Sequence, residues 1–394
     1  MDDYDCLEVI GEGTGGTVYR CIHKHTKQVV ALKRMRSGDL KEGIPFSALR
    51  EIKFLRELSH PRIVSLYDVF SHGDNIYLAF EFLQTDLDHL IHNKTVVLTP
   101  SHIKAYMRML LEGLKFLHSN FIFHRDVKPG NLLLSSTGEL KITDFGLART
   151  FGSPHKVLSG TIATIWYRAP EILYGARFYG PAIDLWAVGC IFVELMTRRP
   201  LFPGNSDLDQ LNKIFSVVDP PTNDSWPDVT LLPSFVPTKP SKLCTLQQIV
   251  PPFFGEDALD LVTMLLTANP NTRITAEKAL DHRYFTEGVL ATPINELPFS
   301  TRAPDTTPGT GSETVGRRLG FLNLDTPRTE KTPLNSEQIS MSRSKPPTIS
   351  SVDRAFLRQR KLDLDAELTD DDEDFGSPPG SRSVDRPVKQ ARLV

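Results

Sequence analysis

The spacing of the apolar residues changes once along this 394-residue chain, near position 82. Before that point, short runs of β-branched, aromatic and aliphatic residues alternate with Gly-containing or polar turns, which is typical of strands. One stretch, residues 46–58, differs because its apolar residues follow helical spacing. The expected strands are residues 4–9, 17–22, 29–34, 63–70 and 76–82.

Beyond position 82 the apolar residues follow helical spacing. Thr99 is a candidate N-cap, and Pro100 follows it at the first helical position, where proline is tolerated. A second strong helix is expected from about residue 184 to residue 196. Together these patterns predict an α+β fold, in which a small β-rich lobe with one helix joins a larger helical lobe. We place the two lobes at residues 4–83 and 84–285.

The composition shifts near position 286. From there to residue 394, Pro, Ser, Thr, Asp and Arg dominate and aromatic residues become rare. A segment of this composition cannot bury enough apolar surface to offset the entropy lost on folding. We therefore expect residues 286–394 to form a disordered tail.

Charge and cysteine content narrow the class of protein. A net charge of −3 gives no bulk electrostatic reason to expect direct binding to nucleic acid or to a membrane surface. The acidic N-terminus does not resemble a signal peptide, and the most apolar stretch, residues 185–196, contains Glu194 and is too short to cross a bilayer. The four cysteines lack CxxC or Cys/His spacing, so we expect reduced thiols in a protein of the nucleus, the cytoplasm or both.

The first motif with chemical meaning is the glycine-rich stretch IGEGTGGTV at residues 10–18. Glycines let a tight hairpin approach phosphates with its backbone N–H groups, although a plain hairpin turn is the alternative. Lys33 follows on the third expected strand, and Glu51 lies on the first expected helix. A lysine in an apolar strand needs a partner, which this carboxylate can supply. The alternative is a surface lysine and an unrelated carboxylate.

Three further motifs follow in order, namely HRDVKPGN at residues 124–131, DFG at 144–146 and APE at 169–171. They match the parts of a phosphoryl-transfer site. In that template Asp126 accepts the hydrogen of the substrate hydroxyl, and Lys128 neutralises charge on the γ-phosphate. Asn131 and Asp144 supply the hard oxygen ligands that Mg²⁺ prefers.

These five elements, in this order, resemble the protein kinase family over about residues 4–285. The resemblance implies the two-lobed kinase fold, ATP and Mg²⁺ as cofactors, and transfer of the ATP γ-phosphate to Ser or Thr. The catalytic residues that it implies are Lys33, Glu51, Asp126, Lys128 and Asn131. The implied ATP-binding residues are Ile10, Gly11, Glu12, Gly13, Gly16, Val18, Ala31, Lys33, Phe80, Glu81, Leu83, Leu133 and Asp144.

Within that set, Phe80 resembles the gatekeeper, and Glu81 and Leu83 resemble the hinge residues whose backbone groups hold adenine. Asn131 and Asp144 correspond to the metal ligands. Asp184 and Arg273 resemble structural anchors of the large lobe, the latter pairing with Glu171. The arginines that correspond to the phosphate-binding residues of the family are Arg50, Arg125 and Arg149.

Several segments narrow the resemblance to the cyclin-dependent kinase (CDK) family. Residues 44–52 resemble the cyclin-contacting helix, and residues 164–171 are typical of the same group. Residues 98–107, 151–154 and 205–211 resemble the CDK-activating kinases associated with TFIIH, and a cell-cycle-related kinase or another CMGC kinase is the alternative. The resemblance implies a cyclin partner, an assembly factor or TFIIH-like complex, and roles in the cell cycle and transcription. It implies protein substrates with Ser/Thr-Pro sites or CDK activation loops.

The chain departs from that pattern at residues 15 and 159, and also at Gly130, to which we attach no consequence. Residue 15 is Gly where many cell-cycle kinases carry an inhibitory tyrosine, while Thr14 is a candidate inhibitory site or simply a turn residue. Ser159 occupies the position of the usual activating threonine, and Thr161 lies two residues later. Both are therefore candidates for phosphorylation of the activation segment.

Two other classes of function remain to be weighed. A scaffold that keeps the fold without the chemistry is disfavoured, because the catalytic set is complete. The tail could also recruit partners. It contains five Ser/Thr-Pro dipeptides, which its composition alone could produce. Residues 317–321, RRLGF, resemble a cyclin-docking peptide, and a solvated basic turn is the alternative.

Overall fold

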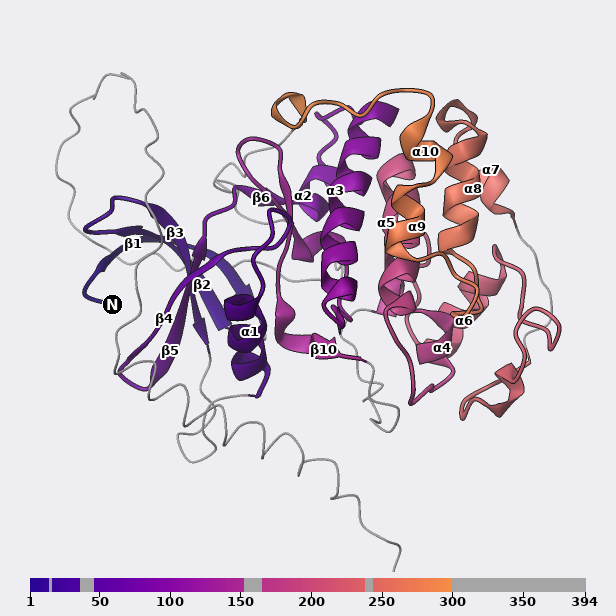
Figure 1. Cartoon of the computed structure of the whole chain (residues 1–394), viewed down its shortest axis with the longest axis horizontal. Helices are drawn as coiled ribbons and strands as arrows, with labels where there is room; N and C mark the ends of the chain where they lie inside the picture. Colours follow the sequence, from indigo (N-terminus) through magenta and orange to yellow (C-terminus); the bar gives the residue numbers. More distant parts are fainter. Residues whose placement is uncertain (14–15, 36–45, 152–164, 238–243, 299–394) are drawn as a thin grey trace, which may run out of the picture. The chain divides into compact units, whose positions relative to one another are not determined.

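The computed structural model of the chain describes residues 1–13, 16–35, 46–151, 165–237 and 244–298 (Figure 1). The candidate phosphorylation sites Thr14, Ser159 and Thr161 lie outside these described residues. The same holds for residues 44 and 45 of the cyclin-contacting motif and for the docking motif at residues 317–321. The described residues confirm the predicted α+β architecture, with a β-sheet lobe and a helical lobe.

Five antiparallel strands form the sheet of the small lobe, in the order β1-β2-β3-β5-β4. In the register, Val18 lies opposite Lys33 and Ala31 lies opposite Phe80. Because side chains of directly opposed residues share a face, these four residues lie on one face of the sheet. The bounds are β1 Tyr4–Gly13, β2 Gly16–His23, β3 Val29–Met35, β4 Leu66–His72 and β5 Asn75–Glu81.

Helix α1 (Phe46–Glu57) belongs to the small lobe and contacts the large one. Its Arg50 donates a hydrogen bond from Nη1 to the carbonyl oxygen of Gly146, 2.7 Å away in the 3₁₀ helix η2 (Phe145–Leu147). The side chain of Glu51 is buried on the same helix. The helix therefore carries a carboxylate toward the sheet and a guanidinium toward the large lobe.

The large lobe is mostly helical. Its helices are α2 Leu87–His92, α3 Pro100–Ser119, α4 Pro170–Leu173, α5 Ala182–Thr197, α6 Asp207–Phe215, α7 Leu246–Ile249, α8 Glu256–Leu265, α9 Ala276–Leu280 and α10 Arg283–Thr286. Its short strands are β6 Thr85–Asp86, β7 Ile122–Phe123, β8 Leu132–Leu134, β9 Leu140–Ile142 and β10 Arg149–Thr150. They pair as β6-β8-β9 and β10-β7.

Helix α5 is the centre of this lobe. Every residue from 183 to 196 is buried, including Trp186 and two carboxylates, Asp184 and Glu194. Helix α3 runs beside α5 (Figure 1). It begins as predicted, because the Thr99 side chain accepts a hydrogen bond from the backbone N–H of His102, with Pro100 in the first turn.

The structure differs from the predicted strand at residues 63–70. Strand β4 begins only at Leu66, because the backbone before it pairs elsewhere. Ile63 forms an isolated parallel bridge to Ile142, and the N–H of Val64 donates to the Ile142 carbonyl at 3.0 Å. These residues therefore connect the sheet to strand β9.

The folded part of the chain extends beyond the boundary predicted at residue 285. A strap, which we define as residues 286–298, includes a turn of 3₁₀ helix, Ile294–Glu296, and the buried Leu297. It is held along α3, where Lys104 Nζ donates to the Glu287 carbonyl at 2.9 Å and the N–H of Thr292 donates to the Ser101 carbonyl at 3.2 Å. Apolar residues are sparse in this segment, which is why composition placed it in the tail.

The prediction of four separate thiols is wrong for two of them. Cys6 and Cys21 are directly opposed on β1 and β2 and form a disulfide. They lie 15 residues apart, and their proximity follows from the register of a hairpin, which Cys spacing alone does not show. Cys190 and Cys244 are free. Within the described part of the chain, no helix is both long and apolar enough to cross a membrane.

A buried ion pair provides the first test of this architecture. Arg273 binds Glu171 through two hydrogen bonds of 2.8 and 2.9 Å, and both side chains are almost fully buried. We expect Arg273→Ala to lower the free energy of unfolding by about 3–5 kcal/mol, because it leaves the Glu171 carboxylate buried without its partner. Urea denaturation of the two proteins measures the difference.

The matched control is the exposed pair Arg283–Asp257, whose atoms are 2.7 Å apart. Arg283→Ala should cost less than about 1 kcal/mol, since exposed ion pairs contribute little. If both variants lost the same stability, the Arg273–Glu171 pair would not be the anchor that we describe.

Candidate active site

Lys33 and Glu51 form a buried ion pair between the sheet and α1. The Lys33 ammonium donates to both carboxylate oxygens of Glu51, at 2.9 and 2.8 Å, and lies 3.9 Å from the carboxylate of Asp144. Burial alone would lower the pKa of Lys33, but the two carboxylates outweigh it and raise that pKa above its ordinary value. Lys33 is therefore a fixed positive charge directed toward Asp144.

Three of the residues predicted to surround adenine lie on the same face of the sheet as Lys33. Val18, Ala31 and Phe80 share this face through the strand register, and Phe80 is buried. Leu133 lies on β8 in the large lobe, and Ile10 lies on β1. The register therefore brings three of these apolar residues to one surface, while Leu133 comes from a separate sheet.

The glycine-rich hairpin depends on Gly16. This residue has a φ of 128°, and a Cβ built on it would lie 2.0 Å from the carbonyl oxygen of Arg34. Only glycine fits this turn without moving the neighbouring strand. Gly11 and Glu12 lie on the same hairpin, on β1, and Gly13 ends that strand.

The predicted hinge residues Glu81 and Leu83 lie where the sheet passes into the large lobe. The Glu81 carboxylate accepts bonds from Lys141 Nζ at 2.8 Å and from the backbone N–H of Ser65 at 2.7 Å. Leu83 is buried. The side chain of Glu81 thus fixes the hinge from both lobes, a role that the sequence did not indicate.

Asp126 occupies the centre of the catalytic loop and is almost fully buried. Its Oδ2 accepts hydrogen bonds from Lys128 Nζ at 2.5 Å and from Asn131 Nδ2 at 2.9 Å. Because both bonds end on Oδ2, Oδ1 is the atom that can accept the proton of a substrate hydroxyl. The three residues that the sequence singled out are therefore in direct contact.

The carboxylate of Asp184, on α5, fixes the backbone of the catalytic loop. It accepts the backbone N–H groups of His124 and Arg125 at 2.8 and 2.9 Å, and the Nε2 of His118 at 2.9 Å. Arg125 has a φ of 71°, an uncommon conformation for a residue with a side chain. Burial would raise the pKa of Asp184, but the hydrogen bonds and nearby histidines lower it, so the group stays ionised.

Asn131 and Asp144 have the chemistry of an Mg²⁺ site. The side-chain nitrogen of Asn131 donates to the backbone carbonyl oxygen of Asp126 at 2.8 Å and to Asp126 Oδ2 at 2.9 Å. The side-chain carbonyl oxygen of Asn131 is therefore the group that can bind a metal. Burial would raise the pKa of Asp144, but Lys33, His124 and Lys128 lower it, which keeps the carboxylate charged. Two hard oxygen donors of this kind fit a magnesium ion.

The three predicted phosphate-binding arginines gather around η2 and β10. Arg50 donates to the Gly146 carbonyl, and Arg125 donates to the carbonyl of the next residue, Leu147, at 3.3 Å. Arg125 also donates to the hydroxyl of Tyr179. Burial raises the pKa of Tyr179, while the charges of Arg125 and Arg149 act to lower it. The arginines are thus brought together, while the candidate phosphorylation sites lie outside the described residues.

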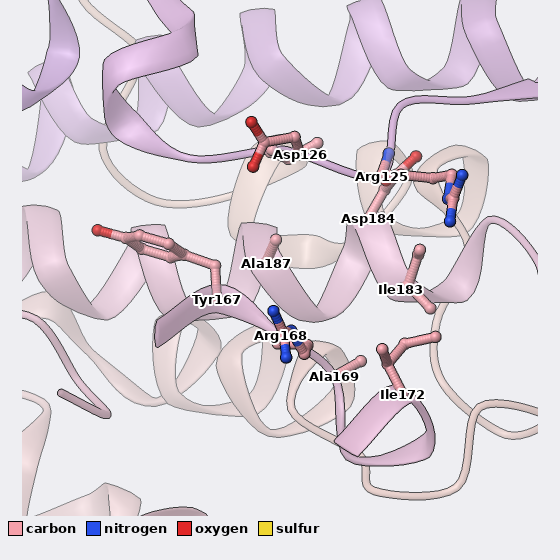
Figure 2. Close-up of a pocket in the computed structure, with 10 residues that line it drawn as sticks. Arg125, Asp126, Tyr167, Arg168, Ala169, Ile172, Ile183, Asp184 and Ala187 are labelled. Carbon is pink, nitrogen blue, oxygen red and sulfur yellow. The ribbon is translucent and has the colours of Figure 1, made fainter. Parts of the chain in front are cut away.

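A small cavity lies beside the catalytic loop (Figure 2). Asp126 and Tyr167 both line it, from different segments of the chain. Tyr167 belongs to the 3₁₀ helix η3 (Ile165–Tyr167), and its hydroxyl donates to Glu194 Oε2 at 2.8 Å. Sequence reasoning missed this contact, although a lone carboxylate in the apolar stretch at 185–196 was the available signal.

The segment around η3 is also fixed to α6. Gln210, which is fully buried, donates from Nε2 to the Trp166 carbonyl at 3.1 Å and accepts the N–H of Gly204 at 2.9 Å. Arg168 forms an ion pair with Asp207 at 3.0 Å. The segment next to the catalytic aspartate is therefore held rigidly by side chains of α5 and α6.

Substitution of Lys33 tests the arrangement of charges. We expect Lys33→Met to lower the rate of phosphoryl transfer by about 100-fold or more, because the phosphates would no longer be held in line for attack. A radiolabel transfer assay to a peptide measures the rate. Lys115→Met, which removes an exposed ion pair with Glu277 at 3.0 Å, is the control and should leave the rate unchanged. An unchanged rate in Lys33→Met would refute the role of this lysine.

Comparison with known proteins gives a consistent picture. The protein kinase domain family matches residues 4–285. The chain is 47% identical over 302 residues to cyclin-dependent kinase 7 of Dictyostelium discoideum, covering 76% of this chain and 84% of that protein. It is 48% identical over 298 residues to cyclin-dependent kinase 7 of Xenopus laevis, covering 75% of this chain and 84% of that protein.

A plant protein and a solved structure extend the comparison. Cyclin-dependent kinase D-1 of Oryza sativa subsp. japonica is 46% identical over 297 residues, covering 75% of this chain and 70% of that protein. The structure of the CAK complex of Chaetomium thermophilum bound to ATP-γ-S contains a chain with a TM-score of 0.71 and 38% identity. The match covers 75% of this chain and 95% of that one.

Proposed function

The chain belongs to the protein kinase family, and within it to the cyclin-dependent serine/threonine kinases, and from this premise we propose how its site works and what it acts on. It transfers the γ-phosphate of ATP to Ser or Thr in proteins, at Ser/Thr-Pro sites or in CDK activation loops. One observation carries this proposal. Asp126 Oδ2 is held by Lys128 and Asn131, while the Lys33–Glu51 pair is formed beside Asp144.

The geometry assigns a task to each side chain. The substrate hydroxyl oxygen attacks the γ-phosphorus, the bond from that phosphorus to the bridging oxygen breaks, and ADP leaves with that oxygen. Asp126 accepts the hydroxyl proton through its carboxylate, and Lys128 offsets charge on the transferred phosphoryl group. Lys33, oriented by Glu51, holds the remaining phosphates. Asn131 and Asp144 would hold Mg²⁺, which when bound neutralises part of the triphosphate charge.

The alternative of a non-catalytic scaffold is disfavoured by the same geometry. A protein that had lost the chemistry would have no need to keep Lys33, Glu51, Asp126, Asn131 and Asp144 in mutual contact. Here each of them lies within hydrogen-bond or ion-pair distance of another.

Asp126→Asn tests the catalytic role directly. We expect phosphoryl transfer to fall by about 10²–10⁴-fold, because the amide cannot accept the proton. ATP binding should stay close to that of the wild type, since the adenine pocket is unchanged. Rapid-quench kinetics and ATP titration measure the two quantities separately. Nearly normal turnover would contradict the assignment.

We also expect a preference for proline after the phosphoacceptor. Arg168 lies next to the candidate substrate site, and the family resemblance gives it and residues 162–163 the task of shaping this subsite. A backbone acceptor left without a donor disfavours residues that bring their own N–H, and proline brings none. A peptide array should therefore show selection for Ser/Thr-Pro. Selection for arginine near the phosphoacceptor instead would exclude this substrate class.

We propose a cyclin as the activating partner, together with an assembly factor or a TFIIH-like complex. The likeness to a chain of the CAK complex supports this, as does the sequence of α1, which resembles the cyclin-contacting helix. We place the protein in the nucleus, the cytoplasm or both, and propose no direct contact with nucleic acid or membrane. Affinity purification from native cells, followed by mass spectrometry, identifies the partners. A preparation that is active without any cyclin would contradict the proposal.

A further inference from the structure

The disulfide between Cys6 and Cys21 joins the first two strands of the small lobe, and the mechanism above does not use it. Cys6 lies on β1, directly opposite Cys21 on β2. Cys21 is fully buried in an apolar cluster with Tyr4, Val30 and Tyr77, whereas Cys6 is exposed. One residue of the pair is therefore open to solvent, and its partner is held beside it.

This disulfide lies at the base of the hairpin that carries the glycine-rich stretch. Residues 10–18 all lie between the two cysteines in the sequence. The pairing of β1 with β2 is irregular at two places between Cys6 and Gly11. Irregularities of this kind interrupt the ladder of hydrogen bonds locally. The disulfide therefore cross-links the two strands just before the point where their backbone pairing is interrupted.

The cross-link lies away from the candidate ATP site. Side chains alternate between the two faces of a sheet along each strand. Cys21 comes three residues after Val18 on β2, so its side chain lies on the face opposite to the one that carries Val18 and Lys33. The disulfide therefore leaves the ATP site unobstructed, and it can affect ATP only through the rigidity of the hairpin.

The hairpin does not depend on the disulfide for its register. The strands also pair on both sides of it, at Tyr4 with His23 and at Glu8 with Arg20. An ion pair of 3.0 Å between Glu8 and Arg20 joins the same strands. The two cysteines should therefore stay opposed after reduction, which allows the same bond to form again.

We propose that Cys6 and Cys21 form a reversible redox site that sets the rigidity of the glycine-rich hairpin and, through it, the affinity for ATP. The structure holds the oxidised form. In the nucleus and the cytoplasm, where we place the protein, cysteines are kept reduced, and a disulfide is usually transient and redox-sensing. The effect on ATP rests on the proposed function.

The oxidant in this proposal is a hydroperoxide, such as hydrogen peroxide. The thiolate of the exposed Cys6 attacks one peroxide oxygen, the O–O bond breaks, and hydroxide leaves and is protonated to water, which gives a sulfenic acid. The thiolate of Cys21 then attacks the sulfenic sulfur, so that the S–S bond forms, the S–O bond breaks and a second water leaves. The two thiols lose two electrons, which the peroxide gains. A dithiol reductant reverses the reaction by exchange and becomes a disulfide itself.

Mass spectrometry of the full-length protein detects the cross-link directly. Trypsin cuts after Arg20, so the cysteines fall in two peptides, residues 1–20 and 21–24, which stay joined only while the disulfide is intact. We expect the joined peptide to be lost in millimolar reduced glutathione and to return after glutathione is replaced by stoichiometric hydrogen peroxide. A disulfide that resists glutathione would be a structural one and would overturn the proposal, as would a joined peptide that does not return.

The two forms should also differ in the hairpin and in ATP binding. We expect amide hydrogen exchange at residues 7–13 and 16–20 to be about 10-fold faster in the reduced form, because strands without the cross-link open more readily. The Kd for ATP with Mg²⁺, measured by isothermal titration, should be about 3-fold higher in the reduced form, because binding must then order a looser hairpin.

Two variants assign the effect to this pair. Cys6→Ser removes the exposed thiol and leaves the buried Cys21 in place. Its exchange rates and its Kd for ATP should match those of the reduced wild type, with or without peroxide. Cys244→Ser is the matched control, because it removes another cysteine that is not fully buried and forms no disulfide. This control should respond to peroxide as the wild type does.

Three further outcomes would overturn the proposal. These are equal exchange rates and equal Kd values in the two forms of the wild type, a response to peroxide that persists in Cys6→Ser, or one that is lost in Cys244→Ser. The comparison of the two wild-type forms needs no substitution, so it tests the idea even if a variant fails to fold. A protein that binds no ATP in either form would refute the proposed function instead, while the joined peptide and hydrogen exchange would still test the redox site.

Discussion

The carboxylate of Asp184 is the contact on which the active site depends. It binds two successive backbone N–H groups of the catalytic loop, and so fixes a segment in which Arg125 has an unfavourable backbone conformation. Strain of this kind persists only where the surroundings impose it. Asp184 can impose this backbone conformation because it belongs to α5, a helix that is buried on all sides. Asp126, Lys128 and Asn131 then follow within a few residues of the fixed point.

The same helix organises the site at two levels. Near its beginning Asp184 holds the catalytic loop, and three turns later Glu194 accepts the hydroxyl of Tyr167 in η3. At its end Arg198 donates to the carbonyl groups of Leu90 and Ile91 on α2. One rigid rod therefore fixes the spacing between the catalytic loop and η3. Because interiors are close-packed, these distances resist change.

The residues of the candidate catalytic loop could be singled out because they are close in sequence and carry a fixed motif. Asp126, Lys128 and Asn131 span six positions, and the loop brings them into direct contact. The contact of Tyr167 with Glu194 joins residues that are 27 positions apart. No local spacing encodes such a contact, since it depends on how η3 packs against α5. The disulfide of Cys6 with Cys21 was missed for a related reason, because it depends on the register of a hairpin.

The strap at residues 286–298 determines where this chain can be shortened. A protein cut after residue 285, where the composition changes, would lose the backbone carbonyl that binds Lys104 and the buried side chain of Leu297. Lys104 is itself buried, so its ammonium would be left without an acceptor and the apolar surface of α3 would be uncovered. A soluble catalytic fragment should therefore end no earlier than residue 298, and limited proteolysis of the intact protein should leave the strap attached.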